Sequence, residues 1–159
     1  MLSEDLKDRI REAYNAIVES KSLTPRWGQR QMIAEIANTL SRIPSSGEGH
    51  SHLPAVCVIE AGTGTGKTIA YAIAAITMAR ALGKRLVVAT ATIALQEQFV
   101  NKDLPDIRQS SGMDFSFALA KGRRRYVCLS KLDRMMEDSH GEPSLIPLYP
   151  DGFGAPLMA

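Results

Sequence analysis

Apolar side chains recur at helical spacing over residues 1–43. Two sets of positions three and four residues apart predict two amphipathic helices, which Thr24 and Pro25 separate. Ser3 is a candidate N-cap of the first helix, and Pro44 would end the second. The apolar positions are Leu6, Ile10, Ala13, Tyr14, Ile17 and Val18 in the first set and Met32, Ile33, Ile36, Ala37, Leu40 and Ile43 in the second.

The pattern changes after a polar loop at residues 44–54. From there, short apolar runs alternate with helical patterns, and such runs are typical of strands buried on both faces of a parallel sheet. The alternation predicts an α/β fold, a parallel sheet flanked by helices. The expected strands are residues 55–60, 85–91 and 115–120, and the expected helices run from Lys67 to Leu82 and from Thr92 to about Asn101.

These patterns divide the chain into four parts. Residues 1–43 hold the N-terminal helices, residues 44–54 the loop, and residues 55–130 the core of the α/β fold. The pattern fades beyond Lys131, so residues 131–159 are expected to be irregular or to begin an inserted domain.

Composition narrows the class of protein. With 45% hydrophobic residues the chain is expected to bury a core. A net charge of +2 is too small to indicate a nucleic-acid partner by itself, so an anionic partner would have to bind at local basic clusters. The longest apolar stretch, from Ile69 to Leu82, is shorter than the roughly 20 residues of a membrane span. Two cysteines far apart in sequence and no leader pattern at the N-terminus predict a cytoplasmic protein without a membrane partner.

The segment AGTGTGKT at residues 61–68 lies between the first expected strand and the long helix, which is the position of a P-loop. Glycines let backbone N–H groups form a concave nest for phosphates, and the helix N-terminus adds positive potential. Lys67 would reach the β- and γ-phosphates, and the Thr68 hydroxyl would bind Mg²⁺. The competing interpretation is a glycine-rich turn without a ligand. The expected nucleotide-binding residues here are Gly62, Thr63, Gly64, Thr65, Gly66, Lys67 and Thr68.

Three flanking segments, PRWGQRQMI, LVVATATIALQEQFVNKDLP and KGRRRYVC, accompany the P-loop. Together with it they resemble the DinG/XPD branch of the superfamily 2 DNA helicases, over roughly Leu23 to Cys128. The resemblance implies a RecA-like P-loop NTPase domain, here incomplete, that uses ATP and Mg²⁺ and binds single-stranded DNA. It also implies 5′ to 3′ translocation by the full-length protein, in DNA repair or in a branch that accompanies type IV CRISPR ribonucleoprotein complexes.

The same resemblance assigns roles to residues outside the P-loop. Arg26, Gln29 and Met32 match the family's Q motif, of which Arg26 and Gln29 are expected to bind the nucleotide. An amide can pair with both N6 and N7 of adenine. Cys128 matches the first of four iron–sulfur ligands, so a cluster would require a longer chain; as an isolated feature Cys128 is a free thiol. The expected DNA-contacting residues are Thr90, Thr92, Gln96, Gln98, Lys121, Arg123, Arg124 and Arg125. Taken alone, the residues from Thr90 to Gln98 also fit a capped helix, and those from Lys121 to Arg125 also fit a solvated turn.

No apolar run of the chain ends in the Asp-Glu pair of a helicase motor, and the chain has no second RecA-like lobe. We therefore expect the N-terminal portion of a longer helicase, inactive alone and dependent on the missing C-terminal portion as its partner. The alternatives are a self-contained P-loop kinase of nucleotides or small molecules and a non-catalytic nucleotide-binding module.

Overall fold

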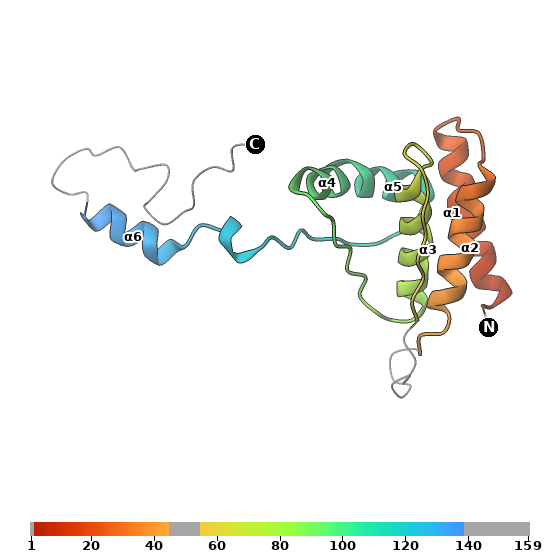
Figure 1. Cartoon of the computed structure of the whole chain (residues 1–159), viewed down its shortest axis with the longest axis horizontal. Helices are drawn as coiled ribbons and strands as arrows, with labels where there is room; N and C mark the ends of the chain where they lie inside the picture. Colours follow the sequence, from red (N-terminus) through yellow and green to blue (C-terminus); the bar gives the residue numbers. More distant parts are fainter. Residues whose placement is uncertain (1, 45–54, 139–159) are drawn as a thin grey trace. The chain divides into compact units, whose positions relative to one another are not determined.

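The computed structural model describes residues 2–44 and 55–138. The chain divides into two compact units, Met1–Ala118 and Leu119–Ala159, shown in Figure 1. Apart from Pro44, the predicted loop at residues 44–54 lies outside the described residues, as does the tail from residue 139.

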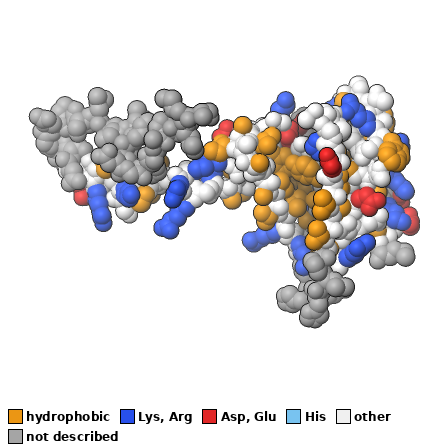
Figure 2. Space-filling view, in the orientation of Figure 1, with side chains coloured by type: hydrophobic (Ala, Val, Ile, Leu, Met, Phe, Trp, Pro, Cys, Tyr) orange, Lys and Arg blue, Asp and Glu red, His pale blue; other side chains and the backbone are white. Residues whose placement is uncertain are grey.

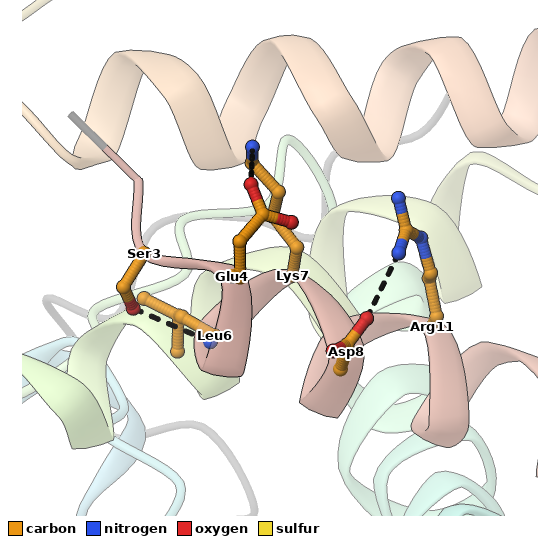
Figure 3. Close-up of polar contacts among 6 residues, drawn as sticks. All are labelled: Ser3, Glu4, Leu6, Lys7, Asp8 and Arg11. Carbon is orange, nitrogen blue, oxygen red and sulfur yellow. Dashed lines mark hydrogen bonds and ion pairs between the residues drawn. The ribbon is translucent and has the colours of Figure 1, made fainter.

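The first helix, α1 (Glu4–Ser20), begins where the sequence predicts, at the Ser3 N-cap. The Ser3 hydroxyl accepts a hydrogen bond from the Leu6 N–H at 3.4 Å. Two ion pairs follow along the exposed face, Lys7 with Glu4 at 2.7 Å and Arg11 with Asp8 at 2.8 Å (Figure 3). The hydrogen bond from Lys7 and its charge lower the pKa of the Glu4 carboxyl.

Two further helices complete a layer with α1 (Figure 1). Helix α2 (Trp27–Leu40) begins at the exposed Trp27 and ends three residues before the predicted end at Ile43, because a turn of backbone hydrogen bonds closes after Leu40. Helix α3 (Lys67–Ala81) has the predicted bounds to within one residue, and Gly83 follows it at φ +63°. This left-handed conformation is the one that favours glycine after a helix.

The core of the first unit lies where α3 packs against α1 and α2 and where α1 packs against α5. Ile17, Ile73 and Met78 are its largest fully buried side chains. Burial of a side chain of this size stabilises a fold by about 1.5–3 kcal/mol. α3 is buried on most of its surface, yet no helix among the described residues has the length and apolar content of a membrane span.

The helix predicted from Thr92 to about Asn101 is longer than expected. It begins as α4 (Ile93–Gln98), continues as a π-helical turn η1 (Phe99–Asp103), and ends as α5 (Leu104–Ser111). A π-helical turn shifts the phase of the side chains that follow it, so apolar spacing cannot be followed through it with a period of 3.6. The ion pair between Lys21 and Asp106 joins the end of α1 to α5.

The parallel sheet is not confirmed: none of the three predicted strands is a strand in the described part of the chain. Strands need neighbours for their backbone hydrogen bonds, and no such pairing is present among the described residues. Some apolar side chains in these runs are therefore open to solvent, with Val58 90% and Val87 86% exposed, whereas Val88, Phe115 and Phe117 are partly buried against the core. Figure 2 shows hydrophobic side chains gathered on one face of the first unit.

The second unit contains a short 3₁₀ turn, η2 (Arg123–Arg125), and helix α6 (Leu129–Asp138). Of the two expectations for residues 131–159, an irregular segment does not hold as far as residue 138, because the helix continues through these residues. The other expectation, the start of an inserted domain, stays a prediction. Apolar residues at positions 129, 132, 135 and 136 give it one apolar face. This set of positions is too short to predict a helix from spacing alone.

Candidate nucleotide-binding site

The P-loop leads directly into α3, as the sequence predicts. Gly64 and Gly66 have φ values of +72° and +77°, in the left-handed region that glycine adopts without strain. The Thr65 hydroxyl donates a hydrogen bond to the Gly62 carbonyl at 2.9 Å and closes the loop. Gly66 is the N-cap of α3, so the N-terminal end of a buried helix faces the loop.

The Lys67 ammonium lies inside this loop. Its Nζ donates hydrogen bonds to the carbonyl oxygens of Ala61 at 2.6 Å and of Gly62 at 2.7 Å. An ammonium has three N–H donors, and these two contacts use loop carbonyls in place of anionic oxygens. The side chain is therefore placed where an anionic group held by the loop would meet it.

Two of the three residues of the predicted Q motif, Arg26 and Gln29, also contact the P-loop, a placement that the resemblance did not specify. The Arg26 guanidinium donates a hydrogen bond to the Gly64 carbonyl. Gln29 is 8% exposed, and its Nε2 donates to the Gly66 carbonyl at 3.4 Å. A Cβ atom at Gly66 would lie 1.9 Å from Gln29 Nε2, so the amide lies directly against this glycine.

A pocket of about 510 Å³ adjoins the loop and brings predicted nucleotide and DNA residues together. Lys67 and Thr68 line it from α3, and Thr90 and Gln98 line it from the segment that includes α4. Thr92 and Gln96 are not among its lining residues. Two of the four predicted DNA-contacting residues of this segment therefore share a pocket with the P-loop.

Tyr71 and Asp103 line the same pocket and were missed from the sequence. Burial raises the pKa of the Tyr71 hydroxyl, a hydrogen bond with Thr68 opposes this, and the Asp103 carboxylate adds to the rise. Tyr71 lies one helical turn after Lys67, a spacing that places both on one side of α3. Asp103 lies at the end of a π-helical turn, where the sequence offers no such signal.

The residues of the pocket fit a magnesium ion in their chemistry. Mg²⁺ prefers oxygen ligands and usually retains several waters beside one or two protein groups and substrate phosphates. The Thr68 hydroxyl supplies such an oxygen next to Lys67, and the Asp103 carboxylate lines the same pocket.

Thr90 and Thr92 form local contacts around the start of α4. Thr92 Oγ1 accepts a hydrogen bond from the Leu95 N–H at 3.2 Å, and Thr90 Oγ1 donates to the Thr92 carbonyl at 3.2 Å. The cap satisfies one of the helix's N-terminal N–H groups. Thr92 thus has a structural role, which leaves its predicted DNA contact as a separate prediction.

The basic cluster, defined here as Lys121, Arg123, Arg124 and Arg125, belongs to the second unit. Its three arginines form η2, and the Lys121 N–H donates to the Tyr126 hydroxyl at 3.1 Å. Lys121, Arg123 and Arg124 are exposed. The structure therefore groups these cations in one short turn.

The two cysteines do not by themselves fit an iron–sulfur cluster. Cys57 and Cys128 are free and exposed, and they lie in different units. A cluster of this kind is held by four ligands, mostly thiolates. Within residues 2–44 and 55–138, no group of three or more metal-ligating side chains is present.

Comparison with known proteins shows the family of this chain. The DEAD/DEAH box helicase family model matches residues 26–137. The chain is 43% identical over 134 residues to the ATP-dependent DNA helicase DinG of Photobacterium profundum, which covers 84% of the chain and 18% of the relative. The DinG proteins of Escherichia coli (strain K12) and Salmonella typhimurium are each 40% identical over 151 residues, covering 94% of the chain and 20% of the relative.

The chain spans about one fifth of the length of these curated relatives. The matches confirm the resemblance to DinG-type helicases that the P-loop and its flanking segments indicated. They also imply a RecA-like P-loop fold, although its sheet is not seen in the described residues. With the family match extending from Arg26 through the P-loop to the basic cluster, the chain belongs to the DEAD/DEAH box helicase family.

Proposed function

We propose that the chain forms the nucleotide-binding part of an ATP-dependent DNA helicase motor. The observation that carries the proposal is the shared pocket, in which Lys67 and Thr68 of the P-loop meet Thr90 and Gln98. In a helicase motor, nucleotide binding must be energetically coupled to DNA binding. Residues of both kinds that line one pocket provide a direct route for this coupling. The family match favours this function over the kinase alternative.

In this proposal the loop binds ATP together with Mg²⁺. Loop N–H groups and the N-terminus of α3 face the phosphates, and Lys67 exchanges its carbonyl partners for phosphate oxygens. Bound Mg²⁺ would neutralise phosphate charge, with the Thr68 hydroxyl holding it. Hydrolysis is assigned to the full-length protein, and the inactivity of the 159-residue chain alone stays a prediction.

Gln29 is proposed to read adenine with the hydrogen-bonding capacity that its contacts leave unused. The contacts with Tyr14 and Gly66 use one lone pair of Oε1 and one hydrogen of Nε2. A second lone pair and a second hydrogen remain, which are what N6 and N7 of adenine require. The proposal predicts a preference for ATP over inosine triphosphate, which lacks the N6 amino group.

We expect Gln29→Ala to remove this preference. A base contact of this kind contributes about 1–3 kcal/mol, so the wild-type chain should bind ATP roughly fivefold or more tighter than inosine triphosphate. Titrations with both nucleotides in Mg²⁺ buffer measure the ratio. Gln31→Ala, an exposed glutamine of the same helix, is the matched control and should retain the ratio. Equal weakening of both nucleotides by Gln29→Ala would show that Gln29 supports the loop without reading the base.

DNA binding is proposed at the Thr90–Gln98 segment and at the basic cluster, with 5′ to 3′ translocation by the full-length protein. Cations and hydroxyls bind the phosphates of a single strand without reading its sequence. The iron–sulfur ligand role of Cys128, a type IV CRISPR complex as partner and the cytoplasmic location remain predictions from the sequence.

We expect Arg123→Ala/Arg124→Ala to weaken single-stranded DNA binding and to flatten its salt dependence. Each phosphate contact contributes about −0.7 to the slope of log affinity against log salt, so two lost contacts should change it by about 1.4. Fluorescence anisotropy with poly-dT and a mixed sequence at several salt concentrations measures both. Arg9→Ala/Arg30→Ala removes the same charge from exposed positions of α1 and α2 and should leave the slope unchanged. Identical slopes in all three proteins would assign the cluster to a solvated turn.

A further inference from the structure

A buried tyrosine of α1 links that helix to the nucleotide site. Tyr14 is 4% exposed, and its hydroxyl forms two hydrogen bonds with Q-motif residues. It accepts one from the Arg26 backbone N–H at 3.3 Å, and it donates one to Gln29 Oε1 at 3.0 Å. Tyr14 lies outside the residues that the helicase family model matches, which begin at residue 26.

The direction of these bonds follows from the groups involved. A backbone N–H only donates, so the Tyr14 oxygen must accept from Arg26. The single phenolic hydrogen is then available for Gln29, whose Oε1 accepts it. This orients the Gln29 amide, because its other end, Nε2, now faces the Gly66 carbonyl. The flipped amide would place two oxygens opposite each other at Gly66, whose carbonyl can only accept.

We propose that Tyr14 is a positioning residue for the nucleotide site. It acts through Gln29: its hydroxyl fixes the side of the amide that meets Gly66, the residue at which the P-loop becomes α3. Its bond with the Arg26 N–H places the start of α2, from which the Arg26 side chain reaches Gly64. The first turn of α2 thereby contacts two loop carbonyls, those of Gly64 and Gly66, and Tyr14 of α1 fixes the position of that turn.

The proposal rests on the proposed function where it concerns ATP. It adds that a residue of α1 affects nucleotide binding by positioning Gln29 and Arg26. Tyr14→Phe removes only the hydroxyl and keeps the ring in the core. The Gln29 amide then loses its orienting partner, and the loop loses its fixed contact at Gly66. Part of the effect on nucleotide binding passes through Gln29, which makes the two positions energetically dependent on each other. The rest passes through the Arg26 N–H, which loses its acceptor.

A double-mutant cycle of Tyr14→Phe and Gln29→Ala tests the dependence, with fluorescent ATP and Mg²⁺ as the probe. We expect Tyr14→Phe to weaken binding by between threefold and about tenfold, the range of one lost hydrogen bond. In the Gln29→Ala background its effect should be smaller, because only the contact with the Arg26 N–H remains to be lost. Independent, additive effects, or an unchanged affinity in Tyr14→Phe, would overturn the proposal.

Ser111→Ala is the matched control for loss of a buried hydroxyl. Its Oγ accepts from the Met113 N–H at 3.2 Å at the end of α5, so the variant also leaves a backbone donor without its partner. It should lower thermal stability without changing ATP affinity. An equal loss of affinity in Ser111→Ala and Tyr14→Phe would assign both effects to general destabilisation and reject the positioning role.

Nuclear magnetic resonance without nucleotide separates this proposal from the proposed function. Tyr14→Phe should shift the side-chain amide signals of Gln29 and the backbone amide signal of Gly66, and Ser111→Ala should leave both in place. Unmoved signals in Tyr14→Phe reject the positioning role. A wild-type chain that does not bind ATP, but whose signals shift in Tyr14→Phe, rejects the proposed function and retains the contact.

Discussion

Lys67→Ala is expected to remove most of the thermal stabilisation that ATP with Mg²⁺ gives the chain. The ammonium forms charge-assisted hydrogen bonds, each worth about 1.5–3 kcal/mol, and the two that it would form with phosphate oxygens are expected to contribute about 100-fold in affinity. At a nucleotide concentration of 100 times the dissociation constant, ligand binding stabilises the wild-type fold by about 2.7 kcal/mol. A 100-fold weaker variant retains only about 0.4 kcal/mol at the same concentration.

Melting curves with and without nucleotide measure this difference. For a chain of this size, about 2.7 kcal/mol corresponds to a shift of roughly 5–11 °C in the midpoint. Lys84→Ala is the matched control: it removes the same charge from an exposed position after α3 and should retain the full shift. An undiminished shift in Lys67→Ala would contradict the assignment of residues 61–68 to phosphate binding.

Gly66→Ala is expected both to destabilise the fold and to lower ATP affinity by more than tenfold. A non-glycine residue in the left-handed region costs about 1–2 kcal/mol. The new Cβ would also meet Gln29 Nε2 at 1.9 Å, so the amide must leave its place against the loop. The substitution therefore disturbs the loop conformation and the Q-motif contact together. Chemical unfolding and nucleotide titration measure the two effects separately.

Gly112→Ala separates backbone strain from the contact with Gln29. Gly112 has a φ of +68°, close to that of Gly66, and no atom lies within 4 Å of a Cβ built there. Because the backbone strain is similar, Gly112→Ala should lower the free energy of unfolding by an amount comparable to the strain part of the Gly66→Ala effect. It should retain ATP affinity. If Gly66→Ala bound ATP as tightly as Gly112→Ala, Gln29 would have no part in the nucleotide site.

The features that the sequence predicted correctly depend on local chemistry. Ser3 caps α1, Gly83 follows α3 in the left-handed conformation, and Gly64 and Gly66 adopt the positive φ values that a phosphate nest needs. Each of these follows from a residue type at one position, together with apolar spacing over the neighbouring turns. The helices α1, α2 and α3 and the P-loop were therefore accessible without knowledge of distant contacts.

What the sequence missed depends on partners elsewhere in the chain. The apolar run at residues 55–60 has the composition of a buried strand, but a strand forms only against a neighbour, and Val58 is exposed. The contact between Tyr14 and Gln29 joins residues fifteen positions apart across two helices. Apolar spacing identified Tyr14 as a core residue and gave no signal for the polar role of its hydroxyl.

The place of Trp27 at the beginning of α2 has an optical consequence. It is the single tryptophan of the chain, and its indole is 70% exposed. It lies between Arg26, which contacts Gly64, and the helix turn that carries Gln29, which contacts Gly66. The emission of one native chromophore therefore reports on the Q motif alone, without labelling, and rapid-mixing fluorescence can record when this segment responds to a nucleotide.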